Sequence, residues 1–323
     1  MKFDNTFYRN KVDWRYKMRK VGYFFSGFLP ILVATAIQLL ATFFLMGIAM
    51  ISLLITKGSF SVDILLNMFA DSYFSTGIMV IYSITCIVLF GLYYYHACGG
   101  EYLPKSSKTF DILQILGIVV LIPGAQFACS YLIGIVSMVF PQWLKQYQDL
   151  IDSAGLTSDI TIAMLCYSVI LAPIGEELIF RGVTMRLARR ALPFWLANIF
   201  QAVMFGIFHM NWIQGIYAFA LGLLLGYVCE KGGSIYYSML LHILFNFWGA
   251  CISQFLGNHI EDTFPTAVMI FLVTIASLSI GSFLFFTGAK RKKQKRSSAT
   301  SLNSPETFTR CTRNRDGSGE ESL

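Results

Sequence analysis

Residues 170–181 read Ile-Leu-Ala-Pro-Ile-Gly-Glu-Glu-Leu-Ile-Phe-Arg, so two carboxylates and a guanidinium lie inside a long apolar stretch. An ionised carboxylate at membrane depth costs roughly 2.5–3.5 kcal/mol on insertion scales. Glu177 and Arg181 are four residues apart and share a helix face, so they can neutralise each other. Glu176 points about 100° away and must face something else. The structural alternative is a salt bridge near the end of a span that reaches water.

The composition around this stretch indicates a membrane protein. Of the 323 residues, 55% are apolar and 13% are charged, against about 25% charged in an average soluble domain. Several apolar stretches exceed 18 residues, which predicts an all-α polytopic membrane protein with about eight transmembrane helices. These helices are expected over residues 23–55, 72–95, 110–140, 160–190, 193–209, 213–230, 234–256 and 264–288.

The distribution of positive charge predicts the orientation of the chain. With both termini inside, only Lys57 and Lys145 of the 25 Lys and Arg residues fall in outside segments, as the positive-inside rule requires. The net charge of +7 does not indicate nucleic acid, because the basic residues crowd at the ends of apolar spans. We expect a multi-pass protein of the cell membrane whose partners are membrane lipids and a peptide or protein substrate.

Five regions follow from these patterns. A basic cytosolic N-terminus covers residues 1–22, and N-terminal transmembrane helices cover 23–158. A helical core over 159–256 carries the polar motifs, and the last transmembrane helix covers 257–289. The remainder, 290–323, is expected to be a basic cytosolic tail, disordered beyond about residue 297, whose first residues contact anionic lipid.

Two further polar motifs lie in the core. Phe205 and His209 end the fifth predicted helix, and His242 and Asn246 share one face of the seventh. Each motif has an ordinary explanation, as an interfacial histidine or as an interhelical hydrogen-bond pair. The spacing of Gly222 and Gly226 predicts a close-packing helix face.

Helix geometry makes a contact between the motifs possible. If the fourth and fifth helices turn near residues 192–193, then Glu176 and His209 both lie about 24 Å from the turn. His242 lies about 14 Å above the turn at Gly233, where Ser234 can cap the next helix. A short or tilted hairpin of the fifth and sixth predicted helices must therefore bring His242 to the depth of Glu176 and His209. The arginines that follow the fourth span are expected to reach the cytosol: Arg186, Arg189 and Arg190.

In this order the motifs resemble the CPBP family of membrane-embedded proteases. The matching residues are Glu-Glu-x-x-x-Arg at 176–181, Phe-x-x-x-His at 205–209 and His-x-x-x-Asn at 242–246. This family groups type II CAAX prenyl endopeptidases with bacteriocin-processing and bacteriocin-immunity proteins, and the resemblance covers about residues 165–250. The zincin motif His-Glu-x-x-His is absent from the sequence, which excludes the unrelated type I CAAX protease.

The resemblance implies a role for each motif residue. Glu176 would activate a water molecule with help from His209, and His242 and Asn246 would stabilise the oxyanion. The supporting residues would be Glu177, Arg181 and Phe205. No cofactor is favoured. The alternative is a zinc site made by Glu176, His209 and His242, since catalytic zinc commonly has three protein ligands.

These roles predict an endopeptidase that opens toward the cytosolic leaflet and cleaves a membrane-associated substrate, lipid-anchored or bacteriocin-like. The alternative is a non-catalytic bacteriocin immunity or membrane scaffold protein of the same fold. Intramembrane Glu and His residues also mark proton paths. A transporter or proton channel is the weaker interpretation, because the polar residues cluster in one place instead of crossing the membrane.

Overall fold

The structure is a computed structural model that describes residues 17–58, 63–64, 67, 71–97, 110–153, 160–253, 255–256 and 263–302. Within these ranges all regular structure is helical. A helix over residues 17–26 precedes the labelled elements. These are α2 (Leu29–Lys57), α4 (Ser72–Ala97), α5 (Ile112–Val139), α6 (Pro141–Ser153), α7 (Ile162–Cys166), η2 (Tyr167–Leu171), α8 (Ala172–Glu177), η3 (Leu178–Thr184), α9 (Met185–Arg189), α10 (Phe194–Phe208), α11 (Trp212–Gly232), α12 (Ile235–Phe247), η4 (Trp248–Ile252) and α14 (Phe264–Leu302).

Seven helical stretches in the described residues are long and apolar enough to cross a membrane. This confirms the predicted all-α polytopic fold. The fifth predicted span is α10, whose 15 residues make a helix of about 22 Å. That length is short of the roughly 30 Å hydrocarbon core of a bilayer. The predicted orientation, with both termini inside, stays a prediction.

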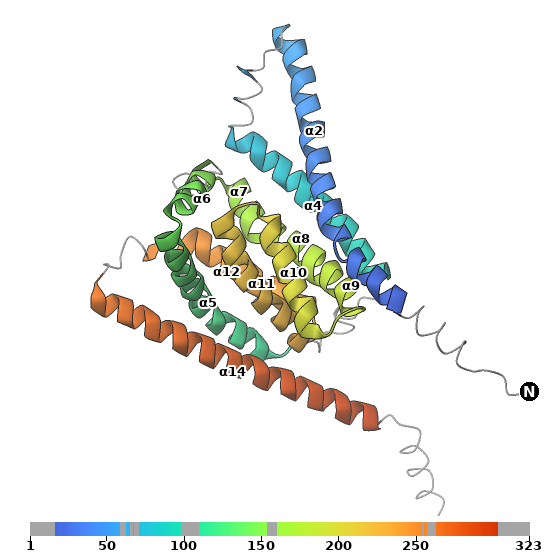
Figure 1. Cartoon of the computed structure of the whole chain (residues 1–323), viewed down its shortest axis with the longest axis vertical. Helices are drawn as coiled ribbons and strands as arrows, with labels where there is room; N and C mark the ends of the chain where they lie inside the picture. The colour runs from blue at the N-terminus through green and yellow to red at the C-terminus, as the bar shows by residue number, and fades with distance from the viewer. Residues whose placement is uncertain are drawn as a thin grey trace, which may run out of the picture.

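The helices form a central core with a pair of helices on each side (Figure 1). The core runs from α7 to α12. The pair α2 and α4 covers one side of the core, and α5 with α14 covers the other. The most extensive packing contact joins α14 to α5. The next joins α10 to α11, which form an antiparallel hairpin.

The outer surface of the bundle is apolar, and its largely apolar core also contains a group of buried polar side chains. On α2 the side chains of Leu40, Phe43 and Phe44 are each more than 60% exposed, as expected for a surface that faces lipid. Polar side chains gather in the core instead, and the fully or nearly fully buried ones include Glu177, Arg181, Asn198, Gln201, Ser238 and His242. Such groups need partners, because an unpaired polar group in an apolar interior is strongly disfavoured.

Glycines set the close approach of the core helices. A Cβ on Gly226 of α11 would overlap the Oδ1 atom of Asn198 on α10, which confirms the predicted close-packing face. Gly233 ends α11 with a positive φ of 66°, a conformation that glycine adopts without strain. Ser234 then caps α12, and its hydroxyl accepts from the Tyr236 N–H at 3.3 Å. The predicted cap is therefore confirmed.

Two features differ from the prediction. Residues 141–153, expected to be a loop, form the helix α6, none of whose side chains is buried. Its mixed apolar and polar composition falls below the threshold for a membrane span, so hydropathy alone missed it. The last helix continues to Leu302, although we expected a disordered tail from about residue 297. Lys, Arg and Gln are good helix formers and extend it beyond the apolar segment. Residues 303–323 of the predicted tail lie outside the described residues.

Candidate active site

Glu176 and Glu177 lie on a helix whose backbone is irregular on both sides. They end α8, between the π-helical segments η2 and η3; such segments often occur at functional sites. The Ala172 N–H bonds to the Tyr167 carbonyl, and Pro173 has no N–H to offer the next carbonyl. The Ser168 carbonyl therefore loses its helical donor, and the Asn246 Nδ2 group donates to it at 2.8 Å. This bond ties α12 to the glutamate helix.

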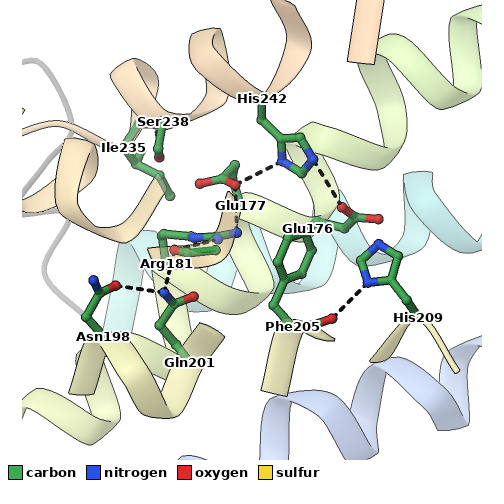
Figure 2. Close-up of polar contacts among 11 residues, drawn as sticks. Glu176, Glu177, Arg181, Asn198, Gln201, Phe205, His209, Ile235, Ser238 and His242 are labelled. Atoms are coloured by element: carbon green, nitrogen blue, oxygen red, sulfur yellow. Dashed lines mark hydrogen bonds and ion pairs between the residues drawn. The ribbon is translucent and has the colours of Figure 1, made fainter. Parts of the chain in front are cut away.

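Glu177 is the centre of a buried ionic network (Figure 2). Its Oε1 atom lies 2.8 Å from Arg181 Nη1 and 3.0 Å from His242 Nδ1. The side chains of Glu177 and Arg181 have no exposed surface, so neither charge is hydrated. A carboxylate oxygen only accepts, so Nδ1 of His242 carries the proton in this bond. The pairing of Glu177 with Arg181 matches the sequence prediction, whereas its bond to His242 was not anticipated.

Arg181 also contacts α10 and α11. Its Nη2 group donates to the Gly222 carbonyl at 3.2 Å, and Gln201 Nε2 donates to the same carbonyl at 2.9 Å. The guanidinium also lies over the ring of Phe205, 4.6 Å from its centroid. Gln201 in turn donates to Asn198 Oδ1 at 2.8 Å (Figure 2). Arg181 thus joins three helices around Glu177.

Glu176 has a different environment from its neighbour. Its side chain is 17% exposed, and its Oε2 atom lies 3.6 Å from His242 Nε2. That distance is too long for a hydrogen bond. Among the described residues this is the one polar contact of the Glu176 carboxylate. The sequence argument that the two glutamates point apart therefore holds: one carboxylate is neutralised and the other stays available.

His209 ends α10 with one ring nitrogen engaged. Its Nδ1 atom lies 2.8 Å from the Phe205 carbonyl, which only accepts, so Nδ1 carries the proton. The Phe205 ring packs edge-on against His209 and His242, with centroid separations of 4.8 Å and 5.7 Å. Within the described part of the chain, Nε2 of His209 has no protein partner. This nitrogen can accept a proton or a hydrogen bond from a molecule in the site.

The four motif residues expected to act on a substrate line one cavity. Its volume is about 610 Å³. Glu176 is the one Asp, Glu, Lys or Arg side chain among its described lining residues. Much of the rest is apolar or carries uncharged hydrogen-bonding groups. Its polar lining residues include Glu176, His209, His242, Asn246, Gln126, Gln214, Tyr82, Tyr147, Tyr167 and Tyr217.

The helix α6 lies against one end of this cavity. Tyr147, Leu150 and Ile151 of α6 contribute to its lining. Aromatic stacking holds the helix there: the Trp143 ring stacks on Phe140 at 4.0 Å and on Trp212 of α11 at 5.3 Å.

The residues that line the cavity indicate from which side of the membrane a substrate enters it. It includes residues from α6 and the start of α11 but none from the arginine-rich end of α9. In a chain with its N-terminus inside, the α6 end of the bundle faces outside. Two predictions from the sequence, an inside N-terminus and a site open to the cytosolic leaflet, therefore cannot both hold.

The zinc alternative does not fit the side-chain placement. Glu176, His209 and His242 line the same cavity, yet no three or more His, Cys, Asp or Glu side chains within the described ranges are placed to hold a metal ion.

The arginines after the glutamates differ from their predicted position. All three were expected to reach the cytosol, but Arg186 is buried and its guanidinium lies 4.9 Å from the centroid of the Tyr94 ring. Stacking on an aromatic ring offsets part of the cost of burying a cation. Arg189 pairs with Glu230 at 3.2 Å near the surface. Only Arg189 and Arg190 are exposed.

Sequence reasoning also missed residues around the site. Asn198 and Gln201 are buried amides three residues apart on α10. Their presence in an otherwise apolar helix was a usable signal, because buried amides need partners. Gln126 was missed too: its Nε2 group donates to the Phe245 carbonyl of α12. A lone glutamine in a long apolar helix offers no comparable spacing signal.

Comparison with known proteins supports the motif assignment. Residues 158–248 match the family model of the type II CAAX prenyl endopeptidase Rce1-like proteins. No curated protein and no solved structure matches the chain. The matched segment contains the Glu-Glu pair, both motif histidines and Asn246. This match places residues 158–248 in the CPBP family, to which the type II CAAX prenyl endopeptidases belong.

Proposed function

We propose that this multi-pass protein is a membrane-embedded endopeptidase in which Glu176 acts as the general base. The observation that carries the proposal is the different use of two adjacent carboxylates. Glu177 is buried and bonded to Arg181 and His242, whereas Glu176 faces a cavity that also holds two imidazoles. A general base must reach the proton that it removes, and Glu176 meets that requirement while Glu177 does not.

The reaction needs one water molecule between Glu176 and His209. Glu176 takes a proton from this water, and the free Nε2 atom of His209 accepts a hydrogen bond from it. The water oxygen then attacks the peptide carbonyl carbon, and the carbonyl oxygen becomes an oxyanion. Glu176 next gives its proton to the amide nitrogen as the carbon–nitrogen bond breaks. A carboxylic acid and an amine leave the site, so atoms and charges balance.

His242 and Asn246 are proposed to stabilise the oxyanion. Nδ1 of His242 is bonded to Glu177, which aims Nε2 toward Glu176 and the cavity. With both ring nitrogens protonated, Nε2 has a hydrogen to donate to the oxyanion. Asn246 uses one N–H for the Ser168 carbonyl, and its amide carries a second N–H. Removing one such donor lowers catalysis by roughly 10²–10³-fold in other hydrolases.

The network behind the site is proposed to position these groups. Arg181 holds Glu177, and Glu177 holds His242. Phe205 supports the arrangement from α10: its ring contacts Arg181 and His209, and its carbonyl fixes the His209 ring. The substrate class is a peptide segment at or within the cell membrane, lipid-anchored or bacteriocin-like, because the cavity is lined by helices that span the membrane.

Cleavage by purified variants tests the proposal. In Glu176→Gln, which keeps the size of the side chain, and in His209→Ala, we expect turnover to fall at least 10³-fold with unfolding temperature unchanged. Asp149→Asn removes an exposed carboxylate of α6 and should leave turnover unchanged. Full cleavage by Glu176→Gln would overturn the proposal. Full protection by Glu176→Gln in a bacteriocin-sensitivity assay would support the immunity or scaffold alternative instead.

A further inference from the structure

A second cavity lies far from the glutamates, where α2, α4 and α9 meet. Figure 1 shows the beginning of α2, the end of α4 and α9 close together near the N-terminal end of the molecule. The cavity has a volume of about 470 Å³. We call it the α2–α4–α9 groove, and its lining is Tyr23, Ser26, Leu29, Pro30, Val33, Leu89, Phe90, Tyr93, Val183, Leu187 and Arg190.

The walls of this groove suit a hydrocarbon chain. Leu29, Val33 and Leu89 are 54%, 46% and 49% exposed, so the groove opens to the surface that faces lipid. The Ser26 hydroxyl donates to the Gly22 carbonyl of its own helix at 2.8 Å, so its hydrogen is not available to the oxygens of a ligand. The groove therefore recognises an apolar ligand along most of its length.

One end of the groove carries a cation. Arg190 is exposed and lies 5.2 Å from the centroid of the Tyr23 ring. The two other arginines of this segment already have partners: Arg186 stacks on the Tyr94 ring, and Arg189 pairs with Glu230. No carboxylate of the described residues pairs with Arg190. A guanidinium in this state matches the two oxygens of a phosphate.

Apolar walls that end at a guanidinium with no carboxylate partner among the described residues have the chemistry of a phospholipid site. We propose that the α2–α4–α9 groove binds an anionic phospholipid, with an acyl chain along Leu29, Val33 and Leu89 and the phosphate on Arg190. Tyr23 and Tyr93 also line the groove, and tyrosine is enriched where proteins meet lipid headgroups. In the predicted orientation this end faces the cytosol, where anionic lipids attract basic segments.

The groove also touches the helix that carries the glutamates. Val183 and Leu187 line it, and Arg181 lies two residues before Val183 in the same continuous helical stretch. A bound acyl chain would pack against this helix beyond Glu176, in a groove that shares no lining residue with the cavity that holds Glu176. The lipid would therefore stabilise the helix without entering the proposed active site.

Native mass spectrometry of the full-length protein, released from nanodiscs of equal phosphatidylglycerol and phosphatidylcholine, tests the site. We expect the wild type to retain phosphatidylglycerol preferentially. One phosphate contact contributes about 1 kcal/mol near a membrane surface, so Arg190→Gln should weaken retention about fivefold. Lys145→Gln removes an exposed cation of α6, outside both the groove and the basic tail, and should change nothing. Val33→Trp fills the groove, keeps Arg190 and should reduce retention of the lipid.

The same measurements can overturn the proposal. Equal losses in Arg190→Gln and Lys145→Gln would show diffuse surface charge instead of a site. Unchanged retention in Val33→Trp would show that no acyl chain occupies the groove. Inorganic phosphate at millimolar concentration should not displace the lipid, and full displacement would identify a simple anion site. None of these readouts depends on proteolysis, so the result is independent of the proposed function.

Discussion

Loss of the Arg181 side chain should destabilise the protein more than loss of any surface cation. Arg181→Met keeps much of the apolar stem of the side chain but leaves Glu177 buried without its 2.8 Å partner. Breaking a fully buried pair by removing one member typically costs about 3–5 kcal/mol, because the remaining charge is uncompensated. The hydrogen bond of Arg181 to the Gly222 carbonyl is lost as well. We therefore expect the free energy of unfolding to fall by about 3–5 kcal/mol.

The chain supplies a matched control in Arg189. Its pair with Glu230 spans 3.2 Å, but the two side chains are 36% and 20% exposed, and such surface pairs contribute about 0–1 kcal/mol. Arg189→Met should therefore lower stability by less than about 1 kcal/mol. The double variant Glu177→Gln/Arg181→Met removes both charges and should recover part of the loss.

Equilibrium unfolding in mixed detergent micelles, followed by tryptophan fluorescence, provides the measurement. The reasoning requires a clear order of stability: wild type, Arg189→Met, the double variant, then Arg181→Met. It would be refuted if Arg181→Met unfolded at the same detergent fraction as Arg189→Met. It would also be refuted if the double variant were less stable than Arg181→Met, because the loss would then not come from an unpaired carboxylate.

Three more predictions concern the cavity and its surroundings. A peptide with Glu beside the scissile bond should be cleaved about 30-fold less well than its Gln counterpart, since repulsion from Glu176 is about 2 kcal/mol at ~8 Å and an effective dielectric constant of ~20; equal kcat/KM values would contradict this. In cells, Met210→Cys should react with an impermeant maleimide from outside and Lys231→Cys only after permeabilisation; the reverse pattern would invert the predicted orientation and open the site to the cytosol. Trp143→Ala removes stacking of about 0.5–1.5 kcal/mol and should speed amide hydrogen exchange in α6 up to about tenfold; unchanged exchange would show that the stack does not hold this helix.

Most of the fold was predictable because apolar length and charge asymmetry are one-dimensional signals. The predicted spans 72–95 and 110–140 correspond to α4 and α5 within three residues at each end. The helix α6 was missed because its Gln, Lys and Asp residues lower its hydropathy, and its position depends on a tertiary stack with Trp212. The extent of α14 was also missed, because charge composition distinguishes poorly between a solvated helix and a disordered tail.

The residues of the candidate site were predictable from the sequence, but most of the contacts between them were not. The i,i+4 spacing of Glu177 and Arg181 indicated their pairing, since both lie on one helix. The bond between Glu177 and His242 joins residues 65 positions apart, and no local pattern encodes it. The link of Asn246 to the Ser168 carbonyl depends on the π-helical backbone before Pro173, which a residue count at 1.5 Å per residue cannot represent.

The most direct test of Glu176 as the base is hydrolysis in labelled water. Membranes that contain the wild-type protein or Glu176→Gln at equal abundance would be incubated in ¹⁸O-water, and new peptide termini would be identified by mass spectrometry. The account predicts a set of new C-termini that carry one ¹⁸O atom from the wild type and is absent with Glu176→Gln. The same labelled termini at the same rate from both proteins would contradict it.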